Sequence, residues 1–341
     1  MKKCMAVYLS LTLMLTGFIC TSAQSDDTLK VISTIFAPYD FVRAIAKDKV
    51  DVSMLLRPGT ESHSYEPTPQ DIIKIQNCDV FIHVGGESDA WVLRVLESMD
   101  MSGMTIITLM DCVDVVEEEI VEGMEHGHDH DDNHDHDEDH DHDEDHDHDE
   151  DHDHDHDEDH DHDEEHAYDE HVWTSPKNAK LIVGSIADLL CDLDADNAAF
   201  YRANLSEYLL QLDELDAQFQ AVVDDSVRRT LVFGDRFPFR YFADAYGLDY
   251  YAAFPGCATE TEPSAATIAF LIDKVRDESI PVVFHAELSN QKMAMTISES
   301  TGAKMQLFHA CHNVTRDEMA AGVTYLELMR GNVESLKEAL K

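Results

Sequence analysis

The sequence predicts an α/β protein with two lobes, each built on a mostly parallel sheet, joined by a long rigid helix. Short apolar runs rich in β-branched residues alternate with helix-periodic stretches in both halves of the chain. Such alternation is typical of parallel sheets that are covered by helices on both faces. Between the halves, residues 175–194 and 197–225 keep apolar residues at three-to-four spacing, which indicates two long helices. At 341 residues and 43% hydrophobic content, the chain is long enough to bury two cores.

The first lobe is expected over residues 28–195. It opens with a strand, a helix and a second strand in LKVISTIFAPYDFVRAIAKDKVDVSMLLRPG, and the Pro-Gly pair ends that unit. The next unit begins with a helix capped near Thr68. The expected strands are the four β-rich runs at 31–35, 52–56, 80–84 and 104–109.

The connecting helix is expected over residues 196–224 and the second lobe over residues 225–341. Strand and helix patterns alternate again in the second lobe. The expected strands are 229–234, 248–254 and 280–288, and the expected helices are 239–246, 263–277, 291–301 and 324–340.

The N-terminus has the pattern of a secretory signal peptide over residues 1–23. Lys2 and Lys3 precede an apolar stretch, and small residues follow it, with Ala23 at the expected cleavage point. We therefore expect a protein that is secreted across the cytoplasmic membrane and is periplasmic or attached to the cell surface. Cys20 leaves lipid attachment open, although the residues before it match a lipoprotein signal poorly.

A run of alternating histidine and aspartate fills residues 126–166. It holds fifteen of the 21 histidines and has no Lys, Arg or aromatic residue. Neutral imidazole is a good ligand for zinc, copper and nickel, and a neighbouring carboxylate can ligate the ion or orient the ring. Because the run has nothing apolar to bury, we interpret it as a disordered loop that captures several divalent ions weakly. A solvated acidic linker is the alternative.

The charge of the chain restricts its partners. A net charge of −47 argues against nucleic acid and against an anionic membrane surface, and it favours a cationic ligand. A zinc hydrolase is the weaker alternative, because no H-E-x-x-H motif is present.

Four segments resemble the zinc and manganese solute-binding proteins of bacterial ABC importers. They are RPGTESHSYEPTPQD, DEHVWTSPKNA, YFADAYGL and TYLELMRGNVESLKEAL, in that order. A charged His-rich run just before the D-x-H-x-W segment is typical of the family's zinc-specific branch. The resemblance covers nearly all of residues 28–341, and it implies a metal ion held in the cleft between the lobes and no catalysed reaction.

The resemblance also implies a set of metal ligands. By motif match, His63 and His171 correspond to the family's first two histidines. Glu287 corresponds to its carboxylate ligand, and His285 would share a face of the strand with Glu287. We treat His83 as structural.

The third family histidine falls on Arg236, which cannot bind a metal. The neighbouring Asp235 is one substitute, unless it pairs with Arg236 or Arg240 instead. His312 is a candidate for the missing imidazole, and His309 is a weaker one that we expect on a strand. We rank Glu287 above Asp235 and His312.

Two cysteines complete what the resemblance implies. Cys257 and Cys311 fall in loops that the family sometimes joins by a disulfide, which would pin the second lobe.

The choice of metal depends on these ligands. Two imidazoles with two carboxylates would suit Mn²⁺, whereas three nitrogens with one carboxylate would suit Zn²⁺. The replaced histidine weakens the zinc interpretation, and the His-rich run restores it, because manganese is the harder ion. We predict a monomeric extracytoplasmic component of an ABC importer that captures Zn²⁺ and delivers it to a membrane permease. The alternatives are a manganese-binding importer component and a surface metal-buffering or adhesin-like protein.

Overall fold

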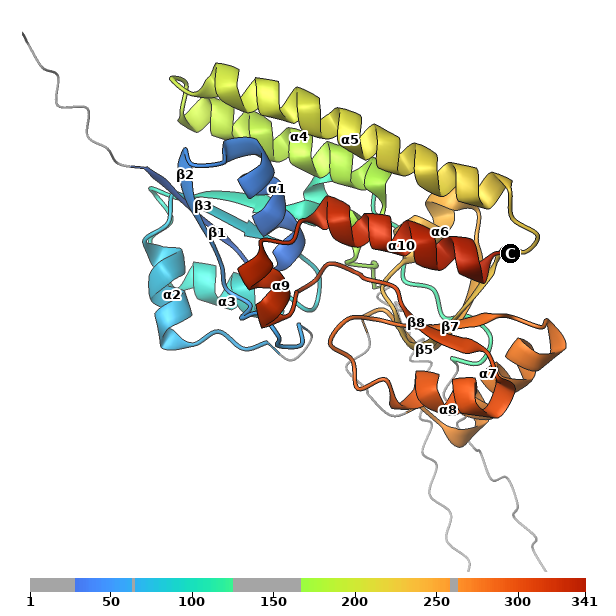
Figure 1. The fold of residues 1–341 in the computed structure, drawn as a ribbon. Coiled ribbons are helices and arrows are strands. Elements are labelled where there is room, and N and C mark those ends of the chain that lie inside the picture. Colours follow the sequence, from blue (N-terminus) through green and yellow to red (C-terminus); the bar gives the residue numbers. More distant parts are fainter. Residues whose placement is uncertain (1–27, 63–64, 125–166, 258–262) are drawn as a thin grey trace, which may run out of the picture.

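The computed structural model describes residues 28–62, 65–124, 167–257 and 263–341. They form two lobes, each with a four-stranded parallel sheet, and long helices lie across both lobes (Figure 1). This arrangement confirms the predicted two-lobe α/β fold. The signal peptide and the His-rich run, expected at 1–23 and 126–166, lie outside the described residues. Within the described part of the chain, no helix is long and apolar enough to cross a membrane.

The first lobe contains a sheet with the strand order β2-β1-β3-β4, and all of its pairs are parallel. A capping box starts its second helix as expected, because Thr68 Oγ1 accepts from the Asp71 N–H and the Asp71 carboxylate accepts from the Thr68 N–H. The elements of this lobe are β1 (Leu29–Ser33), α1 (Phe36–Ala46), β2 (Val50–Met54), α2 (Pro69–Gln76), β3 (Val80–His83), α3 (Ala90–Glu97), β4 (Thr105–Thr108) and the 3₁₀ helix η1 (Leu109–Cys112).

The second lobe repeats this topology with the order β6-β5-β7-β8. Strand β7 is shorter than expected and ends at His285; Glu287 lies in the following turn, where Leu288 has a φ of 60°. The expectation that His285 and Glu287 share a strand face is therefore wrong. The elements are β5 (Thr230–Phe237), α6 (Arg240–Tyr246), β6 (Asp249–Pro255), α7 (Ala265–Asp277), β7 (Val282–His285), α8 (Lys292–Thr301), β8 (Lys304–Leu307) and α9 (Arg316–Ala321).

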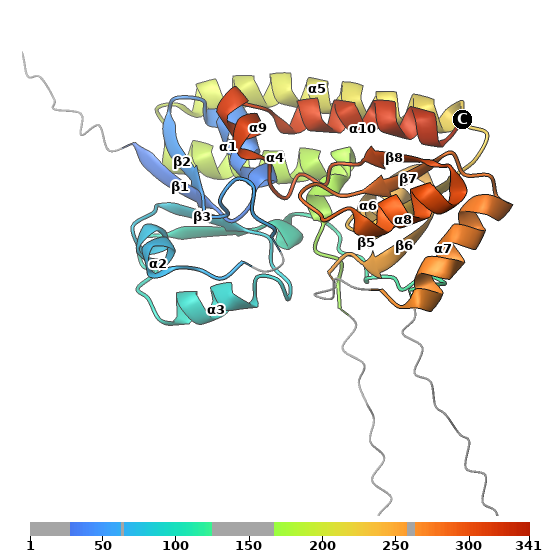
Figure 2. The ribbon, with the colours of Figure 1, turned by 60° about the horizontal axis from the view of Figure 1, so that its bottom comes forward.

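Three long helices run along one side of both lobes. The hairpin of α4 and α5 extends over the whole molecule in Figure 1, and α10 lies beside α5 in Figure 2. Helix α5 matches the expected connecting helix, and the break before it falls at residues 194–197. The remaining elements are the 3₁₀ helix η2 (Val172–Thr174), α4 (Pro176–Leu193), α5 (Ala198–Asp224) and α10 (Tyr325–Ala339).

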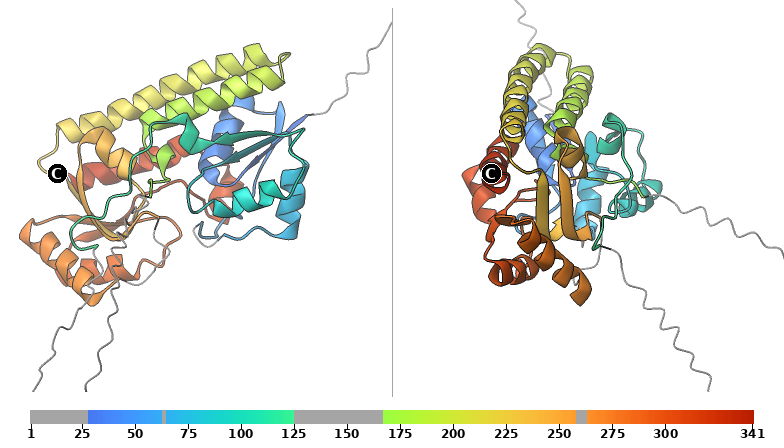
Figure 3. Two further views of the ribbon diagram at one scale, coloured as in Figure 1. Left: turned by 180° about the vertical axis from the view of Figure 1, so that it is seen from behind. Right: turned by 90° about the vertical axis from the view of Figure 1, so that its right-hand side faces the viewer.

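One continuous apolar core joins the two lobes beneath these helices. It includes Val31 of β1, Phe233 of β5 and Phe219 of α5. Neighbouring strand residues face the other way, so Ile32 and Val232 belong to two smaller cores, one in each lobe. In the end-on view of Figure 3 the long helices and the pair α7 and α8 lie on opposite sides of the second sheet. The lobes are thus attached through packed side chains as well as through the connecting chain.

Candidate metal centre

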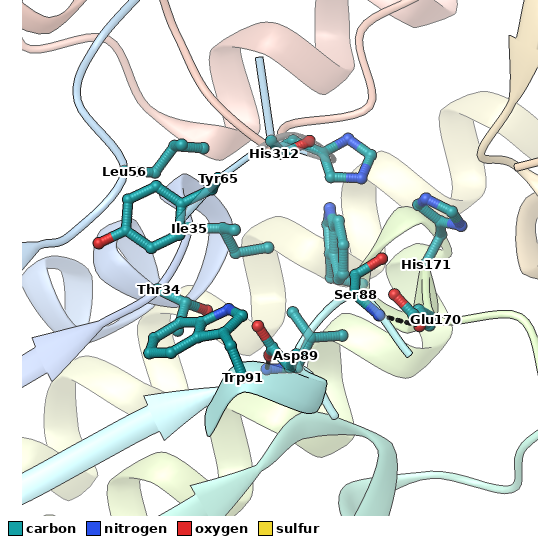
Figure 4. Close-up of a pocket in the computed structure, with 13 residues that line it drawn as sticks. Thr34, Ile35, Leu56, Tyr65, Ser88, Asp89, Trp91, Glu170, His171 and His312 are labelled. Atoms are coloured by element: carbon teal, nitrogen blue, oxygen red, sulfur yellow. Dashed lines mark hydrogen bonds between the residues drawn. The ribbon is translucent and has the colours of Figure 1, made fainter. Parts of the chain in front are cut away.

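A small cavity lies between the lobes, next to the carboxyl ends of the first lobe's strands. Its volume is about 40 Å³, which is room for a few water molecules. In Figure 4 the imidazoles of His171 and His312 lie close together at one end, and Trp91 and Tyr65 lie toward the other. The lining residues are Thr34, Ile35, Leu56, Ser62, Tyr65, Val84, Ser88, Asp89, Trp91, Glu170, His171, Trp173 and His312.

A second cavity, of about 50 Å³, lies on the side of the second lobe. Asp235, Arg236 and Glu287 line it, together with Ser62 and His312, which line the first cavity as well. The structure therefore separates the predicted ligands: His171 lines the first cavity, Asp235 and Glu287 line the second, and His312 lies at both. His63, the residue after Ser62, lies outside the described residues.

His171 is fully enclosed and is oriented by a carboxylate. Asp169 Oδ1 lies 2.9 Å from Nδ1 of His171 and also accepts from the His171 N–H at 2.8 Å. Because an ionised carboxylate only accepts hydrogen bonds, Nδ1 carries the proton and Nε2 keeps its lone pair. Burial opposes a charge on the ring, but the carboxylates of Asp169, Glu170 and Glu118 together outweigh burial and raise the pKa of His171. This is the second-shell arrangement that metal-binding histidines commonly have.

His312 faces His171 directly. The two ring centroids are 4.8 Å apart and the rings are nearly perpendicular, while the Trp173 ring lies 4.9 Å from His312. Burial lowers the pKa of His312, which favours the neutral form that binds metals. The structure thus brings together one histidine from the D-x-H-x-W segment and one from LFHACHNVT, 141 residues apart in the chain.

Glu287 lies behind His312. Its carboxylate accepts from the backbone N–H groups of Ala310 and His312, at 2.7 and 2.9 Å, and lies 3.7 Å from Nδ1 of His312. Burial would raise the pKa of Glu287, but His309, His312 and these N–H groups outweigh it and hold that pKa well below its usual range. Glu287 thus lies on the Nδ1 side of His312, as Asp169 does for His171, but at a longer distance, 3.7 Å against 2.9 Å.

Asp235 sits at an irregularity of β5, where the register with β6 shifts between Phe233 and Arg236. Such a bulge turns a side chain away from the regular alternation. The Asp235 carboxylate accepts from the N–H groups of Arg236 and Ala286, at 2.9 and 3.1 Å. The guanidinium of Arg236 reaches Glu61 across the cleft, at 3.1 Å. A fixed cation therefore lines the second cavity beside Asp235.

The other candidate residues lie away from the first cavity. His309 follows β8, is buried, and its Nδ1 accepts from the Cys311 N–H, so it is not on the strand as expected. His285 Nδ1 lies 2.9 Å from the Ala286 carbonyl oxygen, and buried His83 stacks on Phe81. Among the described residues, no three His, Cys, Asp or Glu side chains are grouped so that they could hold a metal ion.

The disulfide that some members of the resembled family have in these loops is not formed here. Cys257 and Cys311 are both free thiols, and Cys311 is fully buried. The Cys257 N–H instead donates to Glu118 Oε1 at 2.8 Å, and the loop of Cys311 is held by the Glu287 carboxylate.

Sequence reasoning missed two carboxylates beside His171. Asp169 orients the ring, and Glu170 lines the first cavity, where its carboxylate accepts from the Ser88 N–H at 2.8 Å (Figure 4). Burial raises the pKa of Glu170. The D-E-H triplet could have indicated the orienting carboxylate, since the side chain of an acid two residues before a histidine can contact the histidine ring.

The profile of the family described as "Zinc-uptake complex component A periplasmic" (ZnuA) matches residues 31–339. The chain belongs to the ZnuA family. Membership confirms the predicted resemblance, and the family's description as periplasmic confirms the expected location outside the cytoplasm.

Curated relatives include the high-affinity zinc uptake system protein ZnuA of Bacillus subtilis. It is 29% identical over 92% of this chain and 88% of that protein. The zinc-binding protein AdcA of Streptococcus pyogenes is 30% identical, and this ZnuA-family chain spans only 61% of its length.

Solved structures show the same fold. The metal-dependent lipoprotein YcdH of Bacillus subtilis has a TM-score of 0.69 at 26% identity, covering 92% of this chain and 99% of that one. The Zn(II)-bound ZnuA-like domain of Streptococcus pneumoniae AdcA has a TM-score of 0.68 at 25% identity, with 92% and 99% covered.

Proposed function

We propose that this protein captures Zn²⁺ outside the cytoplasm, holds it between the two lobes, and delivers it to a membrane ABC permease. The observation that carries the proposal is the pair His171 and His312, whose rings meet in a buried cavity while a carboxylate lies on the Nδ1 side of each. Membership of the zinc-uptake family and the zinc-binding relatives support the choice of ion.

The proposed nitrogen ligands are His63, His171 and His312. His63 follows Ser62, which lines both cavities, and the other two rings each have the Nδ1 side turned to a carboxylate. Three imidazoles favour Zn²⁺ over Mn²⁺, since manganese prefers oxygen ligands. Glu287 and Asp235 remain the proposed oxygen ligands from the second cavity, and both already accept backbone hydrogen bonds.

Release is proposed to follow separation of the lobes by the permease. Because one apolar core continues through both lobes, we expect a small rotation and not a wide hinge opening. The protein would act as a monomeric binding protein without a catalysed reaction. The His-rich run would raise the local metal concentration by weak binding at many sites.

A competition titration with a zinc chelator tests this function. The full chain, a variant lacking residues 126–166, and His171→Ala in each are titrated with Zn²⁺ and with Mn²⁺. We expect the deletion to lower the stoichiometry but to leave one tight zinc site, and His171→Ala to weaken that site about 1000-fold, beyond the ~10–100-fold typical of outer-shell changes.

His285→Ala is the matched control, since His285 lines neither cavity and should leave the affinity within about twofold. Tighter binding of Mn²⁺ than of Zn²⁺ would establish a manganese-binding component instead. Loss of all tight binding on deletion of residues 126–166 would show that the protein is a metal buffer without a cleft site.

A further inference from the structure

The chain on either side of the His-rich run forms a two-armed strap. One arm is 113–118, which follows η1 of the first lobe; the other is 167–170, which leads into His171. The arms pair antiparallel: the Glu118 N–H donates to the Ala167 carbonyl at 2.8 Å, and the Asp169 N–H donates to the Val116 carbonyl at 2.9 Å. Position in the chain would assign both arms to the first lobe.

The strap is nevertheless fastened to the second lobe, mainly through Tyr241 of α6. The Tyr241 hydroxyl donates to the Asp169 carbonyl at 2.7 Å and accepts from the Val116 N–H at 3.3 Å. One side chain thus holds both arms, and it is buried. On the same lobe, the Cys257 N–H donates to the Glu118 carboxylate.

The residues that follow the strap also lie against the second lobe. A Cβ on Gly256 would come within 2.9 Å of Cε1 of His171, so glycine at this position lets the ring pack against β6's end. Trp173 Nε1 donates to the Ala310 carbonyl at 2.7 Å, and the Tyr325 hydroxyl donates to the Trp173 carbonyl at 2.8 Å. The segment around His171 is therefore hydrogen-bonded to the lobe that also carries His312, and Glu170 adds one bond to Ser88 of the first lobe.

We propose that Tyr241 is a positioning residue of the zinc site: through the Asp169 carbonyl it fixes the carboxylate that orients His171. This inference rests on the proposed function. Without the hydroxyl, the buried Asp169 carbonyl and the Val116 N–H both lose their common partner. A buried polar group without a hydrogen-bond partner is unfavourable, and conformations that expose it to water become more populated. The strap would therefore loosen, and His171 would lose its fixed ring orientation.

Tyr246→Phe is the matched control for Tyr241→Phe. Tyr246 lies on the same helix, is also buried, and its hydroxyl donates to Asp216 at 2.8 Å, away from the strap. Both variants of the full chain lose one hydroxyl from α6, so a general loss of stability affects them alike.

The measurement is the rate at which each protein, loaded with one equivalent of Zn²⁺, gives up its zinc to an excess of a chromophoric chelator. We expect Tyr241→Phe to release zinc about 10-fold faster than the wild type, in the range of outer-shell changes at metal sites, and Tyr246→Phe to stay within about twofold. Co²⁺ bound in place of zinc should show a shifted d–d absorption band only in Tyr241→Phe. Faster hydrogen exchange at the Val116 amide in that variant would show directly that the strap has loosened.

Equal release rates and identical Co²⁺ spectra in the three proteins would overturn the role of Tyr241 while leaving the zinc site intact. A wild type with no slowly released zinc would instead overturn the proposed function, and this inference with it.

Discussion

The two lobes have the same topology but contribute unequally to the site. Each sheet has its first strand flanked by the second and third, and the fourth at the edge. The loops after the first lobe's strands supply walls such as Thr34, Ile35 and Leu56, whereas those of the second lobe carry His312 and Glu287. Parallel sheets decide where loops gather, and the loop residues decide the chemistry.

The strap increases the second lobe's share of the site further. His171 precedes α4 and was expected within the first lobe, yet its neighbours Asp169 and Trp173 are hydrogen-bonded to Tyr241 and Ala310 of the second. The chain around both imidazoles is therefore hydrogen-bonded to the second lobe, while Glu170, the residue before His171, accepts from the Ser88 N–H of the first lobe. The first lobe closes over them with Ser62 and the wall of the first cavity.

The largest expected effect is on zinc affinity, and it shows which of the two cavities holds the ion. His312→Ala should weaken zinc binding about 1000-fold, since it removes a proposed ligand that lies at both cavities. Asp235→Ala should weaken binding less, by about 10–100-fold, because this proposed oxygen ligand already accepts two backbone hydrogen bonds and lies beside Arg236. Chelator competition on the two variants measures both. If Asp235→Ala weakens zinc binding as much as His312→Ala does, the ion lies in the second cavity. The two cavities then contribute more evenly to the zinc site than their geometry indicates.

A smaller effect concerns Asp40, where α1 of the first lobe meets α10. Its carboxylate accepts from the Tyr325 N–H at 2.7 Å and pairs with Arg43, and burial raises the pKa of Asp40 to about 6. The folded state thus binds this proton more tightly than the unfolded state, whose pKa is near 3.8, so the stability contributed by protonated Asp40 is lost as pH rises from about 4 to about 6.

The substitution Asp40→Asn should remove this loss of stability at rising pH. Relative to the wild type, the free energy of unfolding of the variant should rise by about 2 kcal/mol between pH 4 and pH 7. Urea unfolding of zinc-free protein across this range measures it, with Asp213→Asn on the exposed side of α5 as the control. If the free energies of unfolding of Asp40→Asn and the wild type differ by the same amount at every pH, the raised pKa of Asp40 is refuted.

The smallest effect is expected from the ion pair that crosses the cleft. Glu61 and Arg236 are 3.1 Å apart, but the Glu61 side chain is 37% exposed. Partly exposed pairs contribute little, so a double-mutant cycle with Glu61→Gln and Arg236→Gln should give a coupling of about 0.5 kcal/mol in the unfolding free energy. A coupling above about 2 kcal/mol would mean that the lobes are held closed by charge as well as by their shared core.

Most of the fold could be predicted because its signals are local. The start of α2 followed from Thr68, and the structure adds that Asp71 completes a capping box with it. The break before α5 followed from the loss of apolar periodicity around residues 194–196, and it falls at residues 194–197. By contrast, α9 was missed, and the strand expected at His309 lies earlier, as β8 over Lys304–Leu307, because these elements are short and carry too few residues to establish a period.

The candidate site could be predicted only in part. His171 was identified by motif match and His312 as a candidate for the missing imidazole, but their contact depends on a turn after β7 and a loop after β8. The place of Glu287 behind His312 follows from where β7 ends, which the apolar pattern of residues 280–288 did not show.

The sequence by itself determined the two-lobe class, the long helices, the family and the candidate histidines, because periodicity, caps and motifs are properties of near neighbours. Only the tertiary structure decided that the chain before His171 is hydrogen-bonded to Tyr241 of the second lobe, that Glu287 lies beside His312, and that Asp235 opens onto a different cavity. These relations join residues tens to more than a hundred positions apart. They are fixed by buried hydrogen bonds between loops, for which no pattern along the chain exists.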